Sequence, residues 1–361
     1  MTRTQPKKIP FLHIILSLLL VAILGVILWL FFGKEAVSAT PYEATNLAMG
    51  TYLQQTVYGK KGEEAAAAAA KAVSQLEGEI SWRVEDSDVA KLNAAAGDTW
   101  EKINGDTFSL LQKALDVAQQ SGGAYDPTIL PLSSLWDFGG DNQRLPSQEE
   151  LSEFLPYVGY ENLRLSKEEQ TASLKNRLNA LDLGGAGKGA ACDAAVNAYK
   201  DAGAAAAVVA AGGSIGLYGQ KPGGGDWVIA IRDPKIKMED ESTGLGTLKL
   251  SSGFVSTTGV YEKYFEQDQR LYHHVLNPKT GYPAESSLLS VTVVCGDGAL
   301  SDMLSTACFV LGLEESAPLL SHYGAEAVFV DKEDNVFVTG GLKDKLTLTA
   351  AGYTLKAWPA S

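Results

Sequence analysis

An apolar run near the N-terminus constrains this chain most, because it separates a short leading end from a long exported part. Basic residues precede more than 20 mostly apolar residues in "IPFLHIILSLLLVAILGVILWLFFG". A helix of that length crosses a bilayer core of about 30 Å, and the positive flank stays cytoplasmic. We therefore expect a cytoplasmic basic tail at 1–9, a transmembrane anchor or signal sequence at 10–33, a linker at 34–44 and a folded extracytoplasmic domain at 45–361.

The fate of this apolar run has two alternatives. The segment "AVSAT" near Ala39 has the small residues of a signal-peptide cleavage site, although the run is long for a signal-peptide core. No cysteine follows the run closely, so we do not expect a lipid to be attached there. An uncleaved anchor predicts a single-pass membrane protein whose main domain lies outside the cytoplasm.

Composition limits the partners of the exported part. The chain has 361 residues and a formal net charge of −13, and such an acidic balance disfavours a nucleic-acid partner, which would need a basic face. The length suffices for one large domain or two modest ones. Because there is no internal repeat and no long internal linker, we expect one folded unit.

The cysteines predict neither a disulfide framework nor a metal site. There are three of them, Cys192, Cys295 and Cys308, and all lie in apolar or alanine-rich segments. An odd number in such surroundings favours buried thiols that pack as small hydrophobic groups. With four histidines in the chain, one of them in the apolar run, a zinc cluster is not expected.

Hydrophobic patterns predict an α+β domain with mixed or antiparallel sheets and packed helices. Expected helices cover 63–76, with six consecutive alanines, 107–121 with a stop at Gly122 and Gly123, a short helix opened by the capping box Ser147–Glu150, 190–201 and 301–312. Expected strands lie within 48–59, 163–166, 171–175, 177–183, 204–214, 226–234, 246–259 and 287–295, followed by a hairpin at 325–341.

A glycine-rich stretch, "LDLGGAGKGAACDAAVNAYK" at 181–200, suggests a phosphate-binding backbone. It is no P-loop, because Gly189 follows Lys188 where Ser or Thr is needed. A Rossmann finger would need an acidic residue after the next strand, and the chain offers "AAGGS" there. Taken alone, the stretch is also compatible with a tight strand-to-helix turn whose glycines only allow close packing.

Four further segments carry side chains suited to chemistry: "GGAYDP" at 122–127, "VSTTGVYEKYF" at 255–265, "HHVLNPKTGYP" at 273–283 and "SDMLSTACFVLG" at 301–312. Asp302 and Thr306 are four apart on one helix face and offer hard oxygen ligands for Mg²⁺, although Asp302 could equally cap the helix. His273 and His274 alternate along a strand, so at most one of them lines a site.

Together, in order along the chain, these segments resemble the signature segments of the FAD:protein FMN transferases, the ApbE family, once called thiamine biosynthesis lipoproteins. The resemblance runs from about Met49 to beyond Gly312 and adds "MGT", "LDLGGAGKGAACD" and "AGGSIGLYG" to the four segments above. It implies an ApbE-like, T-fold-like bacterial enzyme that takes FAD as substrate with Mg²⁺ as cofactor. Such an enzyme transfers the FMN half to a Thr or Ser of an exported or membrane-bound redox protein and releases AMP.

The resemblance also implies roles for single residues. His274 would be the catalytic histidine, and Asp302, Thr306 and the Gly185 carbonyl would bind the metal ion. Contacts with FAD would come from Met49, Ala124, Tyr125, Asp126, Asp182, Lys188 and Val275. The segment with Ser81, Trp82 and Ser87 would lie near the adenine or flavin rings. Two residues depart from the family pattern: Tyr125 stands where Phe is usual, and Ala186 where a larger aliphatic residue is common.

Two rival functions remain open at this stage. An enzyme of the same fold could hydrolyse FAD to FMN and AMP, with water in place of the protein hydroxyl. A protein without catalytic activity could bind FAD to store or present it, but His274, Asp302 and Thr306 argue against that.

Overall fold

The computed structural model describes residues 40–235 and 244–358. The predicted basic tail and apolar segment therefore lie outside the described residues, as do residues 34–39 of the expected linker. Among the helices of the described part, none combines the length and the apolar character that a membrane crossing requires. The first strand begins at Tyr42, so the end of the expected linker belongs to the folded domain.

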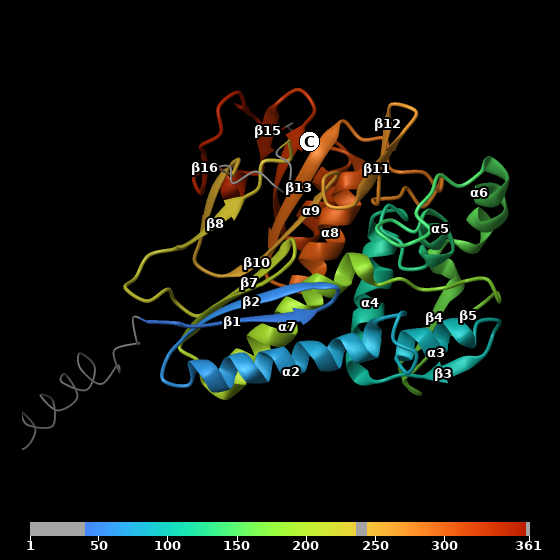
Figure 1. Cartoon of the computed structure of the whole chain (residues 1–361), viewed down its shortest axis with the longest axis horizontal. Coiled ribbons are helices and arrows are strands. Elements are labelled where there is room, and N and C mark those ends of the chain that lie inside the picture. Colours follow the sequence, from blue (N-terminus) through green and yellow to red (C-terminus); the bar gives the residue numbers. More distant parts are fainter. Residues whose placement is uncertain (1–39, 236–243, 359–361) are drawn as a thin grey trace, which may run out of the picture. The chain divides into compact units, whose positions relative to one another are not determined.

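A nine-stranded sheet forms the centre of the domain, in the order β1-β2-β6-β7-β10-β13-β14-β15-β17 (Figure 1). All neighbouring strands are antiparallel except β15 and β17. The strands are β1 (Tyr42–Ala48), β2 (Thr51–Tyr58), β6 (Ala206–Ala211), β7 (Ser214–Tyr218), β10 (Gly253–Gly259), β13 (Leu288–Cys295), β14 (Glu326–Asp331), β15 (Asn335–Val338) and β17 (Thr354–Lys356).

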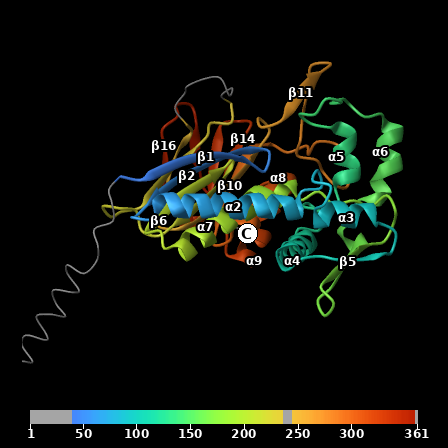
Figure 2. The same ribbon diagram turned by 60° about the horizontal axis from the view of Figure 1, so that its bottom comes forward.

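Three helices lie against one face of this sheet: α2 (Gly62–Ile80), α7 (Gly184–Ala202) and α8 (Gly298–Leu311). Figures 1 and 2 show α2 and α7 side by side across the strands. Half of the buried positions on α2 and α7 are alanines, among them Ala65 and Ala69 on α2 and Ala191 on α7. Small side chains let the helices approach the sheet and each other closely, which is why the alanine-rich sequence is buried here.

The opposite face of the sheet is covered by a second, three-stranded sheet in the order β16-β9-β8. Its strands are β8 (Trp227–Ile231), β9 (Gly246–Leu250) and β16 (Leu346–Leu348). Trp227, Ile229 and Leu248 pack on Val255 and Val328 of the large sheet. The large sheet is thus apolar on both faces, as in a three-layer domain.

The remaining elements include η3, whose Leu342 packs in the core beneath the three-stranded sheet, while the others lie beyond the helical face. The remaining elements together are α3 (Asp88–Ala94), β3 (Trp100–Lys102), α4 (Gly105–Gln120), α5 (Leu130–Trp136), α6 (Gln148–Phe154), η1 (Leu155–Tyr157), η2 (Tyr160–Asn162), β4 (Leu163–Ser166), β5 (Thr171–Leu174), β11 (Tyr264–Gln267), β12 (Arg270–His273), α9 (Ser316–Tyr323) and η3 (Gly340–Leu342). β3, β5 and β4 form a small antiparallel sheet, and β11 and β12 form a hairpin.

Most predicted elements are confirmed. The capping box at Ser147 and Glu150 opens α6, and α4 ends at Gln120, before Gly122 and Gly123. Antiparallel strands occupy 326–338 as predicted. The cysteines are free in the described part of the chain; Cys192 and Cys308 are buried and Cys295 is half-buried.

The strand predicted at 177–183 is wrong. These residues form a turn and a short extended segment in which only Ala180 makes a bridge, to Ile129. The side-chain amide of Asn93 bonds both backbone groups of Leu181, accepting its N–H at 2.7 Å and donating to its carbonyl at 3.0 Å. A side chain from a distant helix therefore takes the place that a neighbouring strand would occupy.

Two helices begin earlier than predicted. α7 begins at Gly184 instead of Ala190, so the glycine-rich stretch is its first turns and no separate loop. α8 begins at Gly298 instead of Ser301, with Asp297 as its N-cap. Asp302 consequently lies inside the helix, and the alternative that it serves as the cap is wrong.

Candidate active site

A contact between two glycines brings α7 and α8 together. A methyl group on Gly189 would lie 1.9 Å from the Gly298 carbonyl oxygen, and one on Gly298 would lie 2.3 Å from the Gly189 oxygen. No side chain fits between the two backbones there. The missing Cβ atoms therefore place the second turn of α7 beside the first turn of α8.

Asp302 is one of the charged residues at this crossing. Its side chain is almost fully buried, at 2% exposure. The carboxylate accepts the N–H of Gly189 at 3.0 Å, and within the described residues it forms no ion pair. A buried carboxylate favours nearby cations, and Lys188 is one of its neighbours.

Thr306 follows one helical turn later and meets Gly185 of α7. A methyl group on Gly185 would lie 3.5 Å from the Thr306 hydroxyl and 3.2 Å from the ring of Tyr125. The Thr258 hydroxyl of β10 lies 2.7 Å from Ser305 and 3.4 Å from Thr306. Thr258 thus links the strand end to the part of α8 that carries Thr306.

These groups fit a magnesium site. A carboxylate, a hydroxyl and a backbone carbonyl, from Asp302, Thr306 and Gly185, are the hard oxygen ligands that Mg²⁺ prefers. The N–H of Gly189, one helical turn after Gly185, donates to Asp302 and so brings its carboxylate to the first turns of α7. Mg²⁺ commonly binds one or two protein carboxylates and leaves positions for phosphate oxygens, which agrees with a single carboxylate here.

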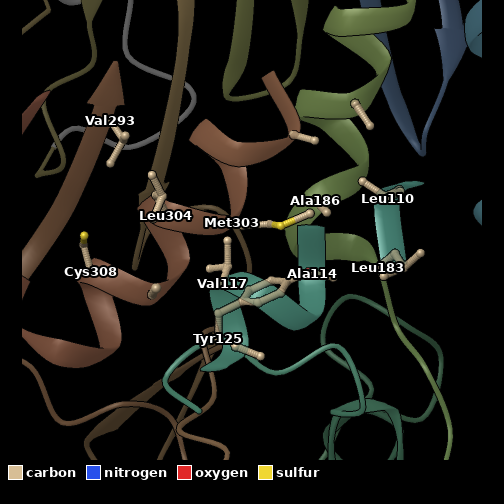
Figure 3. Close-up of a cluster of buried hydrophobic side chains, with 14 of the residues drawn as sticks. Leu110, Ala114, Val117, Tyr125, Leu183, Ala186, Val293, Met303, Leu304 and Cys308 are labelled. Carbon is tan, nitrogen blue, oxygen red and sulfur yellow. The ribbon is translucent and has the colours of Figure 1, made fainter. Parts of the chain in front are cut away.

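The loop after α4 presents Tyr125 to the same place. Figure 3 shows Tyr125 near Ala186 at the start of α7 and Met303 of α8, in one buried cluster. Burial, followed by the charge of Asp302, raises the pKa of Tyr125 well above its usual value, so the phenol stays neutral. Its hydroxyl is buried and has no hydrogen-bond partner among the described residues.

The neighbouring Asp126 serves the loop itself. One carboxylate oxygen accepts the backbone N–H of Thr128 at 2.8 Å and the Thr128 hydroxyl at 2.6 Å. The other accepts the N–H of Tyr160 at 2.8 Å. Burial raises the pKa of Asp126 in spite of these bonds. Because both oxygens are occupied, the side chain shapes the loop, while Ala124 is buried beside it.

Asp182 connects this loop to α7. Its backbone N–H donates to the Pro127 carbonyl at 2.8 Å, and its carboxylate accepts the N–H of Gly184 at 2.8 Å. The second carboxylate oxygen accepts the hydroxyl of Ser133 on α5 at 3.3 Å. Asp182 therefore holds the first N–H of α7, the end at which helices attract anions.

The β1–β2 hairpin reaches the site from the other side. Met49 and Gly50 form its two-residue turn with φ values of 53° and 66°, and positive φ at both positions is typical of a type I′ turn. Met49 is half-buried against the cores beneath α2 and α7. Next to this turn, Thr51 and the Lys188 stem approach Gly212, where a methyl group would lie 3.3 and 3.2 Å from them.

Lys188 is surrounded by acidic groups. The charge of Asp302 is the largest cause that raises its pKa, with Glu262 and Asp182 adding to it and burial opposing it. The ammonium group makes no hydrogen bond or ion pair to another described residue within the usual distances. It is thus a fully charged group with donors available for an anionic ligand.

His274 lies directly after β12, and its side chain is 29% exposed. Its Nδ1 is 3.3 Å from the Lys263 carbonyl, and its Nε2 is 4.0 Å from the carboxylate of Glu262. Burial, followed by the charge of Lys188, lowers the pKa of His274 to about 3. The imidazole is therefore neutral near pH 7 and can accept a proton.

Its neighbour His273 faces the core, as alternation predicts. The ring is buried, packs edge-on against Phe309 at 5.5 Å between centroids, and leaves Nδ1 without a partner among the described residues. Burial lowers its pKa to about 4. Only one of the two histidines is thus near Lys188 and Glu262.

Other predicted contacts have different surroundings. The Val275 side chain is buried in the core, and its carbonyl accepts the Ala284 N–H. Ser87 is the N-cap of α3 and donates to the Ser81 carbonyl at 2.7 Å, so its hydroxyl organises the turn after α2. Trp82 is half-buried at the edge of the core that contains Tyr125. Glu262 was missed, although the quoted segment at 255–265 contains it.

The sequence that forms this site matches the model of a known protein family. The model of the ApbE family matches residues 49–329. The chain belongs to the ApbE family. The match includes every predicted site residue, from Met49 to Thr306, and thus covers the β1–β2 turn, the β11–β12 hairpin and the α7–α8 crossing described above.

Members of the ApbE family with curated names agree along most of the chain. The FAD:protein FMN transferase of Treponema pallidum is 31% identical over 333 residues, which cover 87% of this chain and 91% of that protein. The Escherichia coli K12 protein of the same name is 27% identical over 298 residues, 81% of this chain and 84% of its own.

Solved ApbE structures have the same fold. The ApbE protein of Thermotoga maritima is 33% identical, with a TM-score of 0.78, and covers 84% of this chain and 99% of its own. The apo form of the Pseudomonas stutzeri flavinyl transferase ApbE is 29% identical, with a TM-score of 0.74, and covers 84% and 96%. The α+β arrangement of sheets and helices predicted from the sequence is thereby confirmed.

Proposed function

We propose that the chain transfers the FMN half of FAD to a Thr or Ser hydroxyl of a target protein and releases AMP. Membership of the ApbE family and the names of its relatives support FMN transfer to a protein. The observation that carries the residue-level proposal is one cluster from four distant segments. Gly185 and Lys188, Glu262, His274, and Asp302 with Thr306 all lie around the α7–α8 crossing.

The proposed step uses His274 as the general base. The acceptor hydroxyl loses its proton to Nε2 of His274 while its oxygen forms a bond to the flavin-side phosphorus. The bond from that phosphorus to the bridging oxygen breaks, and AMP leaves with the electron pair. A general base must be unprotonated before the attack, and the neutral imidazole of His274 meets this condition.

The remaining residues would bind and orient FAD. Lys188 supplies a positive charge for the pyrophosphate, and the start of α7 adds the positive end of the helix dipole. Mg²⁺, held by Asp302, Thr306 and the Gly185 carbonyl, would offset the negative charge that develops on the phosphates. Met49 and Tyr125 would border the ligand from the β1–β2 hairpin and the loop after α4.

One incubation separates transfer from its rivals. The full-length chain is mixed with FAD, Mg²⁺ and an acceptor protein with a Thr-containing flavinylation segment, and AMP and covalent flavin fluorescence are measured. We expect both products in equal amounts. AMP without protein-bound flavin would contradict transfer and indicate FAD hydrolysis. FAD that is bound but not consumed would contradict transfer and indicate storage.

A substitution tests the base. His274→Ala should still bind FAD, measured by quenching of flavin fluorescence, but should lose transfer by about 10²–10⁴-fold, the usual contribution of a general base. A matched control is His273→Ala, which removes the buried neighbour that faces Phe309. Full transfer by the folded His274 variant would exclude this histidine as the base.

We also propose that the enzyme works outside the cytoplasm of a bacterial cell, held in the membrane by residues 10–33, and modifies an exported or membrane-bound redox protein. The basic and apolar pattern of residues 1–33 supports this proposal. Protease added to intact spheroplasts should digest the main domain. Protection of the domain until the membrane is lysed would contradict this orientation.

A further inference from the structure

Glu262 is an acidic residue that the proposed reaction has not yet used. It lies in the turn between β10 and β11, and its side chain is 28% exposed. A methyl group on Gly213, in the β6–β7 turn, would lie 2.9 Å from its Oε1. The carboxylate thus approaches a backbone position that only glycine leaves open. Among the described residues, no hydrogen bond to another group holds the carboxylate in place.

The geometry of His274 identifies which ring nitrogen faces Glu262. The Lys263 carbonyl can only accept a hydrogen bond, and it lies 3.3 Å from Nδ1. A neutral ring therefore carries its proton on Nδ1 and leaves the lone pair on Nε2. Nε2 is the nitrogen 4.0 Å from the Glu262 carboxylate.

Electrostatics make this contact selective for the protonated ring. The Glu262 carboxylate has no favourable electrostatic interaction with the Nε2 lone pair of a neutral imidazole. It attracts the positively charged imidazolium at the same distance. The other charged groups near His274 are Lys188 of α7 and Lys263, both of which disfavour a positive ring, while His273 stays neutral. Glu262 also faces Lys188, Lys263, Arg232 and Asp302, and it is the carboxylate within ion-pair distance of Nε2.

We propose that Glu262 is a positioning residue for His274, whose carboxylate orients the ring and stabilises the imidazolium formed when the acceptor hydroxyl gives up its proton. The proton stays on Nε2 during the attack and leaves to water after AMP is released, so Glu262 itself neither gains nor loses a proton. This inference rests on the proposed function, in particular on His274 as the base.

The test uses the full-length chain with FAD, Mg²⁺ and the Thr-containing acceptor protein. Glu262→Gln keeps the shape but removes the charge, and it should lower kcat about tenfold while the KM for FAD changes less than twofold. Glu262→Asp should recover part of the lost kcat. Glu266→Gln is the matched control, because Glu266 is an exposed carboxylate on β11 of the same hairpin, and it should behave as wild type.

A double variant distinguishes this role from a general structural one. If Glu262 acts through His274, then Glu262→Gln should cause no further loss in the His274→Ala background, since the group it serves is gone. An additional tenfold loss there, or a change in KM alone, would overturn the inference and assign Glu262 to FAD binding or to folding.

The outcomes also separate the inference from the proposed function. Wild-type kcat in Glu262→Gln together with an inactive His274→Ala would overturn the role of Glu262 and leave FMN transfer with its base intact. Full activity of His274→Ala would overturn the base, and the role of Glu262 with it.

Discussion

Two buried tyrosines differ in what their hydroxyl groups contact. The Tyr125 hydroxyl has no partner among the described residues, whereas the Tyr199 hydroxyl donates to Oε1 of Gln55 at 2.7 Å. Both rings are packed in cores on the same side of the large sheet. These two tyrosines therefore allow a comparison of how much a buried hydroxyl contributes to the free energy of unfolding with and without a hydrogen-bond partner.

Tyr125→Phe should leave the free energy of unfolding unchanged or raise it by up to about 1 kcal/mol, because it removes a buried polar group that bonds to nothing. Tyr199→Phe should lower it by about 1–3 kcal/mol, since Gln55 then loses its donor. Urea denaturation of the two variants measures both values. A loss above about 1 kcal/mol in Tyr125→Phe would mean that its hydroxyl has a partner in the folded protein.

Individual site residues could be predicted from the sequence where a segment resembles a family signature. Glu262 was not predicted in this way, although it lies in such a segment. It meets His274 because β11 and β12 pair Tyr264 with His273, which brings the residues flanking the hairpin together. The hairpin turn itself consists of Asp268 and Gln269, both with positive φ. The usual signal for such a turn contains glycine, so nothing local in the sequence predicted this hairpin.

The start of α7 shows a similar limit at the scale of elements. Four glycines within six residues favour a turn on propensity alone, but the structure makes them helical. Glycine is required at Gly189 because the backbone of α8 occupies the space of its side chain. Tertiary packing decides the conformation here, and a single sequence contains no direct sign of that contact.

Gly189→Ala should destabilise the protein by about 3 kcal/mol or more, because its methyl group would overlap backbone atoms that cannot move without separating α7 from α8. The control is Gly187→Ala, where the nearest atom to the new methyl group is the Ile80 Cδ1 at 3.8 Å. In that variant the higher helix propensity of alanine should raise the free energy of unfolding by about 0.5–1 kcal/mol. Thermal unfolding of both variants measures the difference, and equal stability would refute a tight contact.

At the scale of the whole molecule, the antiparallel α+β architecture followed from the alternation of apolar residues and the alanine-rich helices. The location of the site did not, because it depends on which loops meet at the helical face. Met49, Tyr125, Lys188 and His274 come from two hairpins, a loop and a helix start. Their order along the chain does not indicate that they are neighbours.

Buried histidines make the stability of the molecule depend on pH. The pKa of His273 falls from 6.5 to about 4 on folding, so below pH 6.5 the unfolded chain binds more protons than the folded one. The stability that this residue contributes is therefore present above pH 6.5 and is lost as the pH falls through 4. Asp193 works in the opposite sense, because its pKa is raised to about 6.

Comparison with His273→Leu isolates the histidine. The free energy of unfolding of the wild type should fall relative to that of the variant by roughly 2–3 kcal/mol between pH 7 and pH 4. Groups such as Asp193 contribute equally to both proteins and cancel in the difference. Urea denaturation at several pH values measures this slope. A constant difference over the whole range would show that His273 does not titrate with a lowered pKa.

Binding of Mg²⁺ should stabilise the molecule if Asp302, Thr306 and Gly185 hold the ion. A ligand that binds only the folded state adds about 2.7 kcal/mol at a concentration 100 times its Kd, so the thermal midpoint should rise with added Mg²⁺ before any FAD is present. Asp302→Asn should remove this response. Without Mg²⁺ the same variant should be less stable than wild type, because buried Lys188 loses the charge of Asp302, which is the largest cause raising its pKa.

Asp193→Asn is the matched control for the metal response. Its carboxylate lies on α7 and accepts the N–H groups of Gly298 and Ala299 at 2.8 Å each, so it joins the same two helices without belonging to the proposed ligands. The variant should lose stability yet keep the rise in thermal midpoint with Mg²⁺. If the rise is lost in Asp302→Asn but kept in Asp193→Asn, a general weakening of the α7–α8 crossing is excluded as the cause of the loss. A rise that survives in Asp302→Asn would place the ion elsewhere.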